Sequence, residues 1–186
     1  MNPIKNKKDL KTSINEIRKF AYSYLEQYSP SKQQLRIYLF KKFLKKNQKI
    51  YNKKELFSLI DVVVSTLVDE KFLNDKYYSD SKSKALLRRG YSLNKIRYSL
   101  INKGIDEKYI KASISKIMND ESDPDFFSAI KICKRRRIGP CRDESNRSLY
   151  YKKDISILAR SGFSYEISKK VLEIPKVEFK KFCKMI

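Results

Sequence analysis

The sequence predicts an all-α protein made of three tandem three-helix repeats, helix-turn-helix-like in their connections, that stack into an elongated, curved body. Only 4 Gly and 5 Pro occur among the 186 residues, and this scarcity suits helices with short connections better than a many-turned β-sandwich. Apolar residues recur at helical spacing along nearly the whole chain. A pattern of helix, glycine stop, N-cap and helix also recurs, at Leu100, Gly104, Asp106 and Ile110 and again at Leu158, Gly162, Ser164 and Ile167.

The breaks in this pattern divide the chain into five segments. A polar N-terminal segment precedes the three repeats, and a C-terminal tail is expected to form a short helix. In order, the five segments span residues 1–12, 13–73, 74–119, 120–174 and 175–186. Three-helix units of this size bury little apolar surface alone, so we expect them to stack on one another. A single globular bundle is the alternative.

Capping residues indicate where most of the helices begin and end. Side chains that can accept a hydrogen bond from first-turn amides occur at Ser31, Asn52, Asn74, Ser92, Asp106, Asp123 and Ser164. Pro124 suits a first helical position, and Asn52 followed by Glu55 resembles a capping box. Gly90 and Gly104 are candidate left-handed stops. Helices of the first and third repeats are expected at about residues 13–27, 124–138, 148–160 and 164–173.

The net charge of +22 predicts a polyanionic partner, either nucleic acid or an acidic protein surface. The excess of Lys and Arg is spread along the chain, so the whole body is cationic and not only a tail. The alternative is that the many lysines reflect a lysine-rich coding bias and only keep the exposed faces solvated. No apolar run approaches the roughly 18–20 residues that cross a bilayer, and the first residues carry no signal-peptide core, so we expect a cytoplasmic protein without a membrane partner. We also expect it to be a monomer.

The composition argues against an enzyme, a cofactor or a metal site. There is no histidine, which removes the commonest general base and a common zinc ligand. The four glycines are isolated and never form a phosphate-binding loop. The acidic segment 120–125 lacks the central glycine and terminal glutamate of a calcium loop, so we interpret it as a linker with an N-cap. Three cysteines without close spacing indicate reduced thiols.

The most distinctive segment is an arginine-rich stretch that closes a predicted helix and continues past a Gly-Pro break. Its candidate contact residues are Arg135, Arg136, Arg137, Arg142 and Arg147. Arginine presents a planar fork of donors to phosphate or carboxylate, although cations at a helix C-terminus also favour the helix dipole. A second patch contains Arg88, Arg89, Arg97 and Lys103. Nearby tyrosines could stack on bases, but tyrosine at helical spacing usually packs in a core.

Several motifs resemble the RecX family in both order and spacing. In the first two repeats they are Tyr24-Leu25, Ser31 with Leu35-Arg36, Leu73-Asn74-Asp75 with Tyr77, and Lys103-Gly104-Ile105. Farther on, Arg135–Pro140 and Gly162–Tyr165 resemble the alphaproteobacterial branch of that family. The likeness runs from about Phe20 to Leu172, and the last two motifs are the most specific.

The resemblance implies a non-enzymatic regulator that binds in the helical groove of RecA–DNA filaments. It implies inhibition of RecA strand exchange, ATP hydrolysis and co-protease activity, and with them regulation of DNA repair, recombination and the SOS response. Both patches of basic residues would then face RecA or DNA. Two other functions compete with this one: a nucleic-acid-binding module that acts on DNA, single- or double-stranded, without RecA, and a scaffold protein that binds neither.

Overall fold

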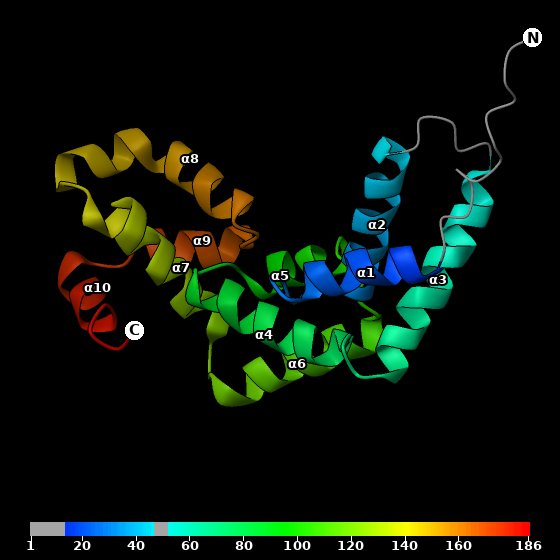
Figure 1. Cartoon of the computed structure of the whole chain (residues 1–186). Coiled ribbons are helices and arrows are strands. Elements are labelled where there is room, and N and C mark those ends of the chain that lie inside the picture. Colours follow the sequence, from blue (N-terminus) through cyan, green and yellow to red (C-terminus); the bar gives the residue numbers. More distant parts are fainter. Residues whose placement is uncertain (1–13, 47–51) are drawn as a thin grey trace, which may run out of the picture. The chain divides into compact units, whose positions relative to one another are not determined.

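The computed structural model describes residues 14–46 and 52–186, and all the regular structure in those residues is helical (Figure 1). The predicted all-α class is confirmed. The chain divides into two compact units, of which the first ends at Tyr78 and the second spans Ser79–Ile186. Within the described residues, no helix is both long enough and apolar enough to cross a membrane.

The first unit is built on three helices and the start of a fourth. These are α1 (Ile14–Leu25), α2 (Lys32–Lys46), α3 (Lys53–Asp69) and α4 (Asp75–Arg88). The predicted cap of α2 is a complete capping box, because Ser31 Oγ accepts from Gln34 N while Gln34 Oε1 accepts from Ser31 N, both at 3.2 Å. The predicted cap of α3 is also present: Asn52 Oδ1 accepts from the amides of Lys54 and Glu55.

One apolar face from each of α1, α2 and α3 meets in the core of this unit. The largest fully buried side chains are Ile17, Leu35, Leu39, Phe43, Ile60 and Leu67. Burying an aliphatic side chain of this size contributes roughly 1.5–3 kcal/mol relative to leaving it exposed. The run Val62, Val63 and Val64 lies within α3, although β-branched residues favour strands, and Val63 and Val64 are buried in this core.

The second unit continues from α4 through six further helices and one turn of 3-10 helix. The helices are α5 (Leu93–Ile101), α6 (Glu107–Asp120), α7 (Pro124–Arg136), α8 (Glu144–Arg160), α9 (Tyr165–Leu172) and α10 (Lys176–Phe182), and the 3-10 turn is Gly139–Cys141. The predicted caps at Ser92, Asp106, Asp123 and Ser164 all accept hydrogen bonds from first-turn amides. The tail forms the predicted short helix, α10.

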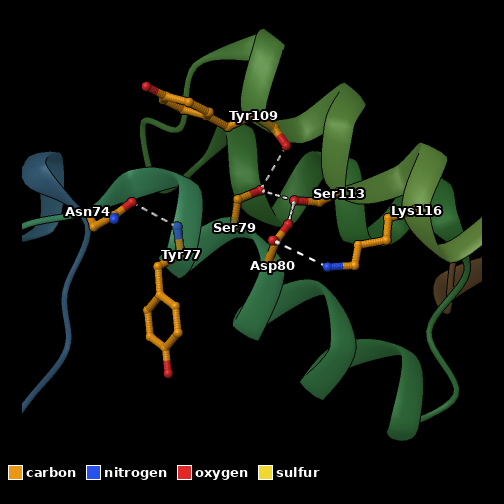
Figure 2. Close-up of polar contacts among 7 residues, drawn as sticks. All are labelled: Asn74, Tyr77, Ser79, Asp80, Tyr109, Ser113 and Lys116. Carbon is orange, nitrogen blue, oxygen red and sulfur yellow. Dashed lines mark hydrogen bonds and ion pairs between the residues drawn. The ribbon is translucent and has the colours of Figure 1, made fainter.

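A polar network joins α4 to α6 (Figure 2). The buried Ser113 Oγ donates to Asp80 Oδ1 at 2.6 Å and lies 2.8 Å from Ser79 Oγ, which donates to the Tyr109 carbonyl. Lys116 Nζ lies 4.0 Å from Asp80 Oδ2 at the exposed edge of the network. Short serine side chains let the two helices approach closely, and these bonds satisfy the buried hydroxyl groups of Ser79 and Ser113.

A large apolar core of the second unit lies among α7, α8, α9 and α10. It includes Phe126, Ile130, Ile132, Cys133, Leu158, Phe163, Val171, Leu172 and Phe179. The face of α7 that carries Ile130, Ile132 and Cys133 is fully buried, and its last turn ends in exposed basic residues. The basic segment is therefore held against a rigid apolar support.

Five of the helices in residues 14–46 and 52–186 end with a residue in the left-handed region after the last turn; after α3 this residue is Lys71, with φ 65°. Glycine occupies that position after α4, α5 and α8, at Gly90, Gly104 and Gly162, with φ between 69° and 92°. After α7 the position is taken by Arg137, with φ 53°, and Ile138 N donates back to Cys133 O at 3.1 Å. An L-residue with a side chain pays an energetic cost in this conformation that glycine does not.

Two boundaries in the third repeat differ from those predicted. Helix α8 begins at Glu144, ahead of the predicted start at residue 148, because its first turn is wholly polar and carries no apolar periodicity. Helix α7 stops at Arg136 because Arg137 leaves the helical conformation. The division into three repeats and the curved shape of the whole chain stay predictions.

Candidate polyanion-binding site

The second unit carries a hollow of about 400 Å³ whose walls are strongly basic. Its lining residues are Arg88 at the end of α4, Lys131, Lys134 and Arg135 in the last turns of α7, and Ile186. We call this feature the basic hollow. Its lining in the described part of the chain contains four cationic side chains and no acidic one.

Local structure explains why these cations gather. Lys134 and Arg135 follow Lys131 by three and four residues, so all three side chains lie on one face of α7. The end of α4 reaches this face because Gly90 has no side chain: a Cβ there would lie 3.0 Å from Ser128 O and 3.1 Å from Lys131 Cβ. The close approach places Arg88, two residues before Gly90, beside α7.

Backbone carbonyls, not carboxylates, hold two of these cations in place. Arg135 Nη1 donates to Arg89 O at 2.7 Å, and Lys134 Nζ donates to Cys183 O at 3.1 Å. A carbonyl orients a cation without cancelling its charge. The basic hollow therefore retains a positive potential that attracts phosphate or carboxylate groups.

Arg135 begins an arginine triplet, Arg135–Arg137, whose other two members directly follow the hollow residue in sequence. Arg136 closes α7 and Arg137 follows it, and both are exposed. Within residues 14–46 and 52–186, no hydrogen bond or ion pair engages either guanidinium group. Both can therefore reach a partner without first breaking an internal contact.

Arg142 and Arg147 occupy a different environment from the triplet. Arg142 forms a two-point ion pair with Asp154, whose side chain is 1% exposed, and its guanidinium lies 4.5 Å from the centroid of the Tyr150 ring. The hydrogen bond to Asp154 raises the pKa of Arg142 further above its ordinary value. Arg147 donates to Leu172 O at 2.6 Å and Ile174 O at 3.0 Å, which satisfies carbonyls at the end of α9.

The second predicted patch is also divided by the structure. Arg88 and Arg89 meet Arg135, as described above. Arg97 instead forms an exposed ion pair with Glu107, with Nη2 and Oε1 2.8 Å apart, and Lys103 is half-buried with a contact inside the protein. The structure thus brings together Arg88, Arg89 and Arg135 from two separate patches, and leaves Arg97, Arg142 and Arg147 outside the hollow.

The predicted contact set leaves out Lys131 and Lys134. Their spacing relative to Arg135 could have placed them on the same helical face, but only the approach of α4 shows that this face lines a hollow. The described residues also contain no group of three or more Cys, Asp or Glu side chains that could hold a metal ion.

Comparison with known proteins identifies several similar sequences. No family model matches the chain. The regulatory protein RecX of Myxococcus xanthus (strain DK1622) is 29% identical over 171 residues, which cover 90% of this chain and 89% of that protein. The regulatory protein RecX of Clostridium botulinum (strain Eklund 17B / Type B) is 28% identical over 163 residues, which cover 88% of this chain and 70% of that protein.

Two solved structures share the fold. The crystal structure of RecX from Lactobacillus salivarius matches with a TM-score of 0.57 at 18% identity, covering 86% of this chain and 94% of that one. A second RecX crystal structure matches with the same TM-score at 19% identity, covering 93% of this chain and 80% of that one. The chain is therefore similar along most of its length to regulatory proteins named RecX, and it shares its helical fold with RecX crystal structures.

Proposed function

We propose that this chain regulates the RecA recombinase by binding the RecA–DNA filament, and that it inhibits RecA ATP hydrolysis, strand exchange and co-protease activity. It acts by occupancy and not by catalysis. The basic hollow, together with Arg136 and Arg137, is the main contact surface. The RecX relatives support the RecA partner, and the charge and geometry of the hollow support the kind of contact.

One observation carries this proposal more than any other. Two arginine patches about 46 residues apart in the sequence meet in one hollow, where Arg135 bonds the carbonyl of Arg89 and Arg88 lines the same wall. Like charges repel, so a structure gathers them only where other contacts hold them in place. Here Gly90 and the buried face of α7 supply that support. An anionic partner relieves the repulsion and gains several charge-assisted hydrogen bonds.

A filament is a suitable partner for such a surface. Its subunits and its DNA repeat along an axis, so a chain with several weak basic contacts can engage more than one repeat at once. Contacts made within one bound complex add through effective concentration, and each contact alone can stay weak. This fits a net charge of +22 that is spread over the chain.

The test compares two variants with equal loss of charge. The hollow variant carries Arg88→Ala, Lys131→Ala and Arg135→Ala. The control variant carries Lys111→Ala, Lys152→Ala and Lys169→Ala, which are exposed lysines of the same unit outside the hollow. RecA ATPase is measured on single-stranded DNA at fixed salt, and thermal unfolding followed by circular dichroism checks that both variants fold.

We expect the hollow variant to lose most of its inhibition and the control variant to retain it. Binding to assembled RecA filaments is then measured by co-sedimentation, at a salt concentration that abolishes binding to naked DNA. Equal inhibition by the two variants would remove the hollow from the proposal. Failure of the wild-type chain to co-sediment under these conditions would favour a module that acts on DNA alone.

A further inference from the structure

The first unit carries a second hollow, of about 520 Å³, lined by Ser23, Tyr24, Gln27, Tyr28 and Tyr38. We call it the tyrosine hollow. Its volume lies within the range of small-molecule sites, about 300–1,000 Å³. In contrast to the basic hollow, its lining residues carry no charged side chain. It offers aromatic faces, hydroxyl groups and one amide.

The three tyrosines form a continuous stack. The rings of Tyr38 and Tyr24 are stacked with centroids 4.0 Å apart and an interplanar angle of 20°. The Tyr24 and Tyr28 rings follow at 4.8 Å and 35°. Tyr28 N donates to Tyr24 O at 3.0 Å, so the turn after α1 holds Tyr28 over the end of the helix.

The stack ends in an accessible ring. Tyr28 is 55% exposed, whereas Tyr24 and Tyr38 are half-buried between it and the core. A core of Leu35 and Leu39 beneath α2 is already complete without Tyr28, since both leucines are fully buried. The outer ring therefore serves as a platform that is supported from below and open above.

Polar side chains lie at the edge of this platform, and lysines occur nearby on the same helices. The Gln27 amide and the Ser23 hydroxyl can donate and accept hydrogen bonds at its edge. Lys19 lies one turn before Ser23 in α1, and Lys41 lies one turn after Tyr38 in α2; both are exposed. An uncharged aromatic floor, on helices that also carry exposed lysines, suits a stacked base of a strand with negatively charged phosphates.

We propose that the tyrosine hollow binds an unpaired base of single-stranded nucleic acid, stacked on Tyr28, with Gln27 at the edge of the base and Lys19 and Lys41 near the flanking phosphates. The net charge of +22 favours this partner over a cationic side chain of another protein, which would also stack on tyrosine. The proposal extends the contact with DNA-containing filaments proposed above. It concerns the free strand, so it can be tested without RecA.

The experiment measures binding of the full chain to a fluorescein-labelled oligo(dT) and to an abasic oligonucleotide of the same length, by fluorescence anisotropy at fixed salt. The variants are Tyr28→Leu and Tyr28→Phe, and the control is Tyr98→Leu, since Tyr98 is 59% exposed in the second unit. Stacking of one base contributes about 1–3 kcal/mol, so we expect Tyr28→Leu to weaken oligo(dT) binding by about 5- to 150-fold. Tyr28→Phe keeps the ring, so we expect it and Tyr98→Leu to bind within about two-fold of wild type.

Cross-linking locates the base directly. An oligonucleotide with 5-iodouracil is irradiated with the protein, and we expect mass spectrometry to find the adduct on Tyr28 or its neighbours in the hollow. Equal affinity of the wild-type chain for oligo(dT) and the abasic strand would overturn the inference, as would adducts that map only to the second unit. If Tyr28→Leu weakens binding to RecA filaments but not to oligo(dT), the hollow is a protein contact and the inference is wrong. Inhibition of RecA ATPase is scored separately, so failure here is distinguishable from failure of the proposed function.

Discussion

The carboxylate of Asp154 holds the guanidinium of Arg142 at two points, with Nε to Oδ2 at 2.7 Å and Nη2 to Oδ1 at 2.8 Å. The same Oδ2 accepts from Gly139 N at 2.9 Å. The Asp154 side chain is 1% exposed and that of Arg142 is 21% exposed. This pair therefore fixes the 3-10 turn at Gly139–Cys141 onto α8 and supports the end of the basic segment.

We expect Asp154→Ala to destabilise the second unit by about 3–5 kcal/mol, because it leaves the partly buried Arg142 guanidinium and the buried Gly139 amide without their hydrogen-bond partner. Urea unfolding followed by circular dichroism measures the change. Arg97→Ala is the matched control, since the Arg97–Glu107 pair is exposed and such pairs contribute about 0–1 kcal/mol. Equal destabilisation by the two variants would contradict the structural role of Asp154. If the role holds, loss of RecA regulation in an Arg142 variant reports loss of structure and not loss of a contact.

We expect Arg137 to lower the free energy of unfolding while contributing to the inhibition of RecA. It takes the left-handed position that glycine occupies after α4, α5 and α8. We expect Arg137→Gly to raise the free energy of unfolding by about 0.5–1 kcal/mol, because glycine adopts this conformation without strain. The same variant is expected to inhibit RecA less, because an exposed cation beside the basic hollow is lost.

Arg136→Gly is the control for Arg137→Gly. Arg136 is also exposed, but it is the last residue of α7 and helical, so glycine there is expected to cost up to about 1 kcal/mol relative to a good helix former. Both variants lose one arginine, yet their stabilities are expected to change in opposite directions. Thermal unfolding and RecA ATPase measured on the same preparations separate the two effects. Two stabilities shifted in the same direction would show that the strain at Arg137 is unimportant.

Asp125 links two helices and gives the protein a predicted pH dependence. Its Oδ1 accepts from Leu93 N, the first amide of α5, at 2.7 Å. Burial raises the pKa of Asp125 above its ordinary value of 3.8, and the hydrogen bond from Leu93 opposes that rise only in part. The folded state therefore binds the proton more tightly than the unfolded state. Ionisation of Asp125 costs stability at neutral pH, and this cost disappears as the pH falls through the raised pKa.

Asp125→Asn keeps an oxygen for Leu93 N and removes the charge. We expect it to be at least as stable as the wild-type chain at neutral pH, with an advantage that shrinks as the pH approaches 3.8. Urea unfolding at both ends of that pH range gives the difference. Asp106→Asn, at an exposed N-cap, serves as the control. A variant that is weaker than wild type at neutral pH and unresponsive to acid would refute the assignment.

Local features of this fold could be predicted from the sequence because short-range chemistry determines them. Ser92, Asp106 and Asp123 cap their helices through amides two or three residues away, and Gly90 and Gly104 take the left-handed turns expected of them. In each case the residue type and its immediate neighbours suffice. The same reasoning fails at α8, whose first turn offers no apolar residue to indicate a helix.

Long-range partners could not be predicted in this way. Arg142 and Arg147 belong to the same arginine-rich stretch as Arg135, and nothing local distinguishes them. Asp154 and the carbonyl of Leu172 bind them from 12 and 25 residues away. The basic hollow likewise depends on contact between α4 and α7. The sequence indicates which residues are cationic, but the packing decides which of them remain available to a partner.

The turn after α8, at Ser161 and Gly162, is packed against the start of α5. Ser92 N donates to Ser161 O at 3.3 Å, and the neighbouring Gly162 has φ 92°. A Cβ at Gly162 would lie 2.4 Å from Ser92 Oγ and 2.7 Å from Lys95 Cβ, both closer than packed atoms allow. The Ser92 hydroxyl cannot turn aside freely, because it caps α5 by accepting from Lys95 N.

Gly162→Ala therefore incurs the strain of a positive φ, a steric clash and the loss of a helix cap. We expect it to lower the free energy of unfolding by about 3 kcal/mol or more, of which roughly 1–2 comes from the backbone and about 1 from the cap. Gly104→Ala is the matched control: Gly104 has φ 69° but is exposed, so only the backbone cost of about 1–2 kcal/mol is expected. Urea unfolding of both variants tests the difference. Equal losses would mean that the turn after α8 is free to move away from α5, and that the two elements are not rigidly joined.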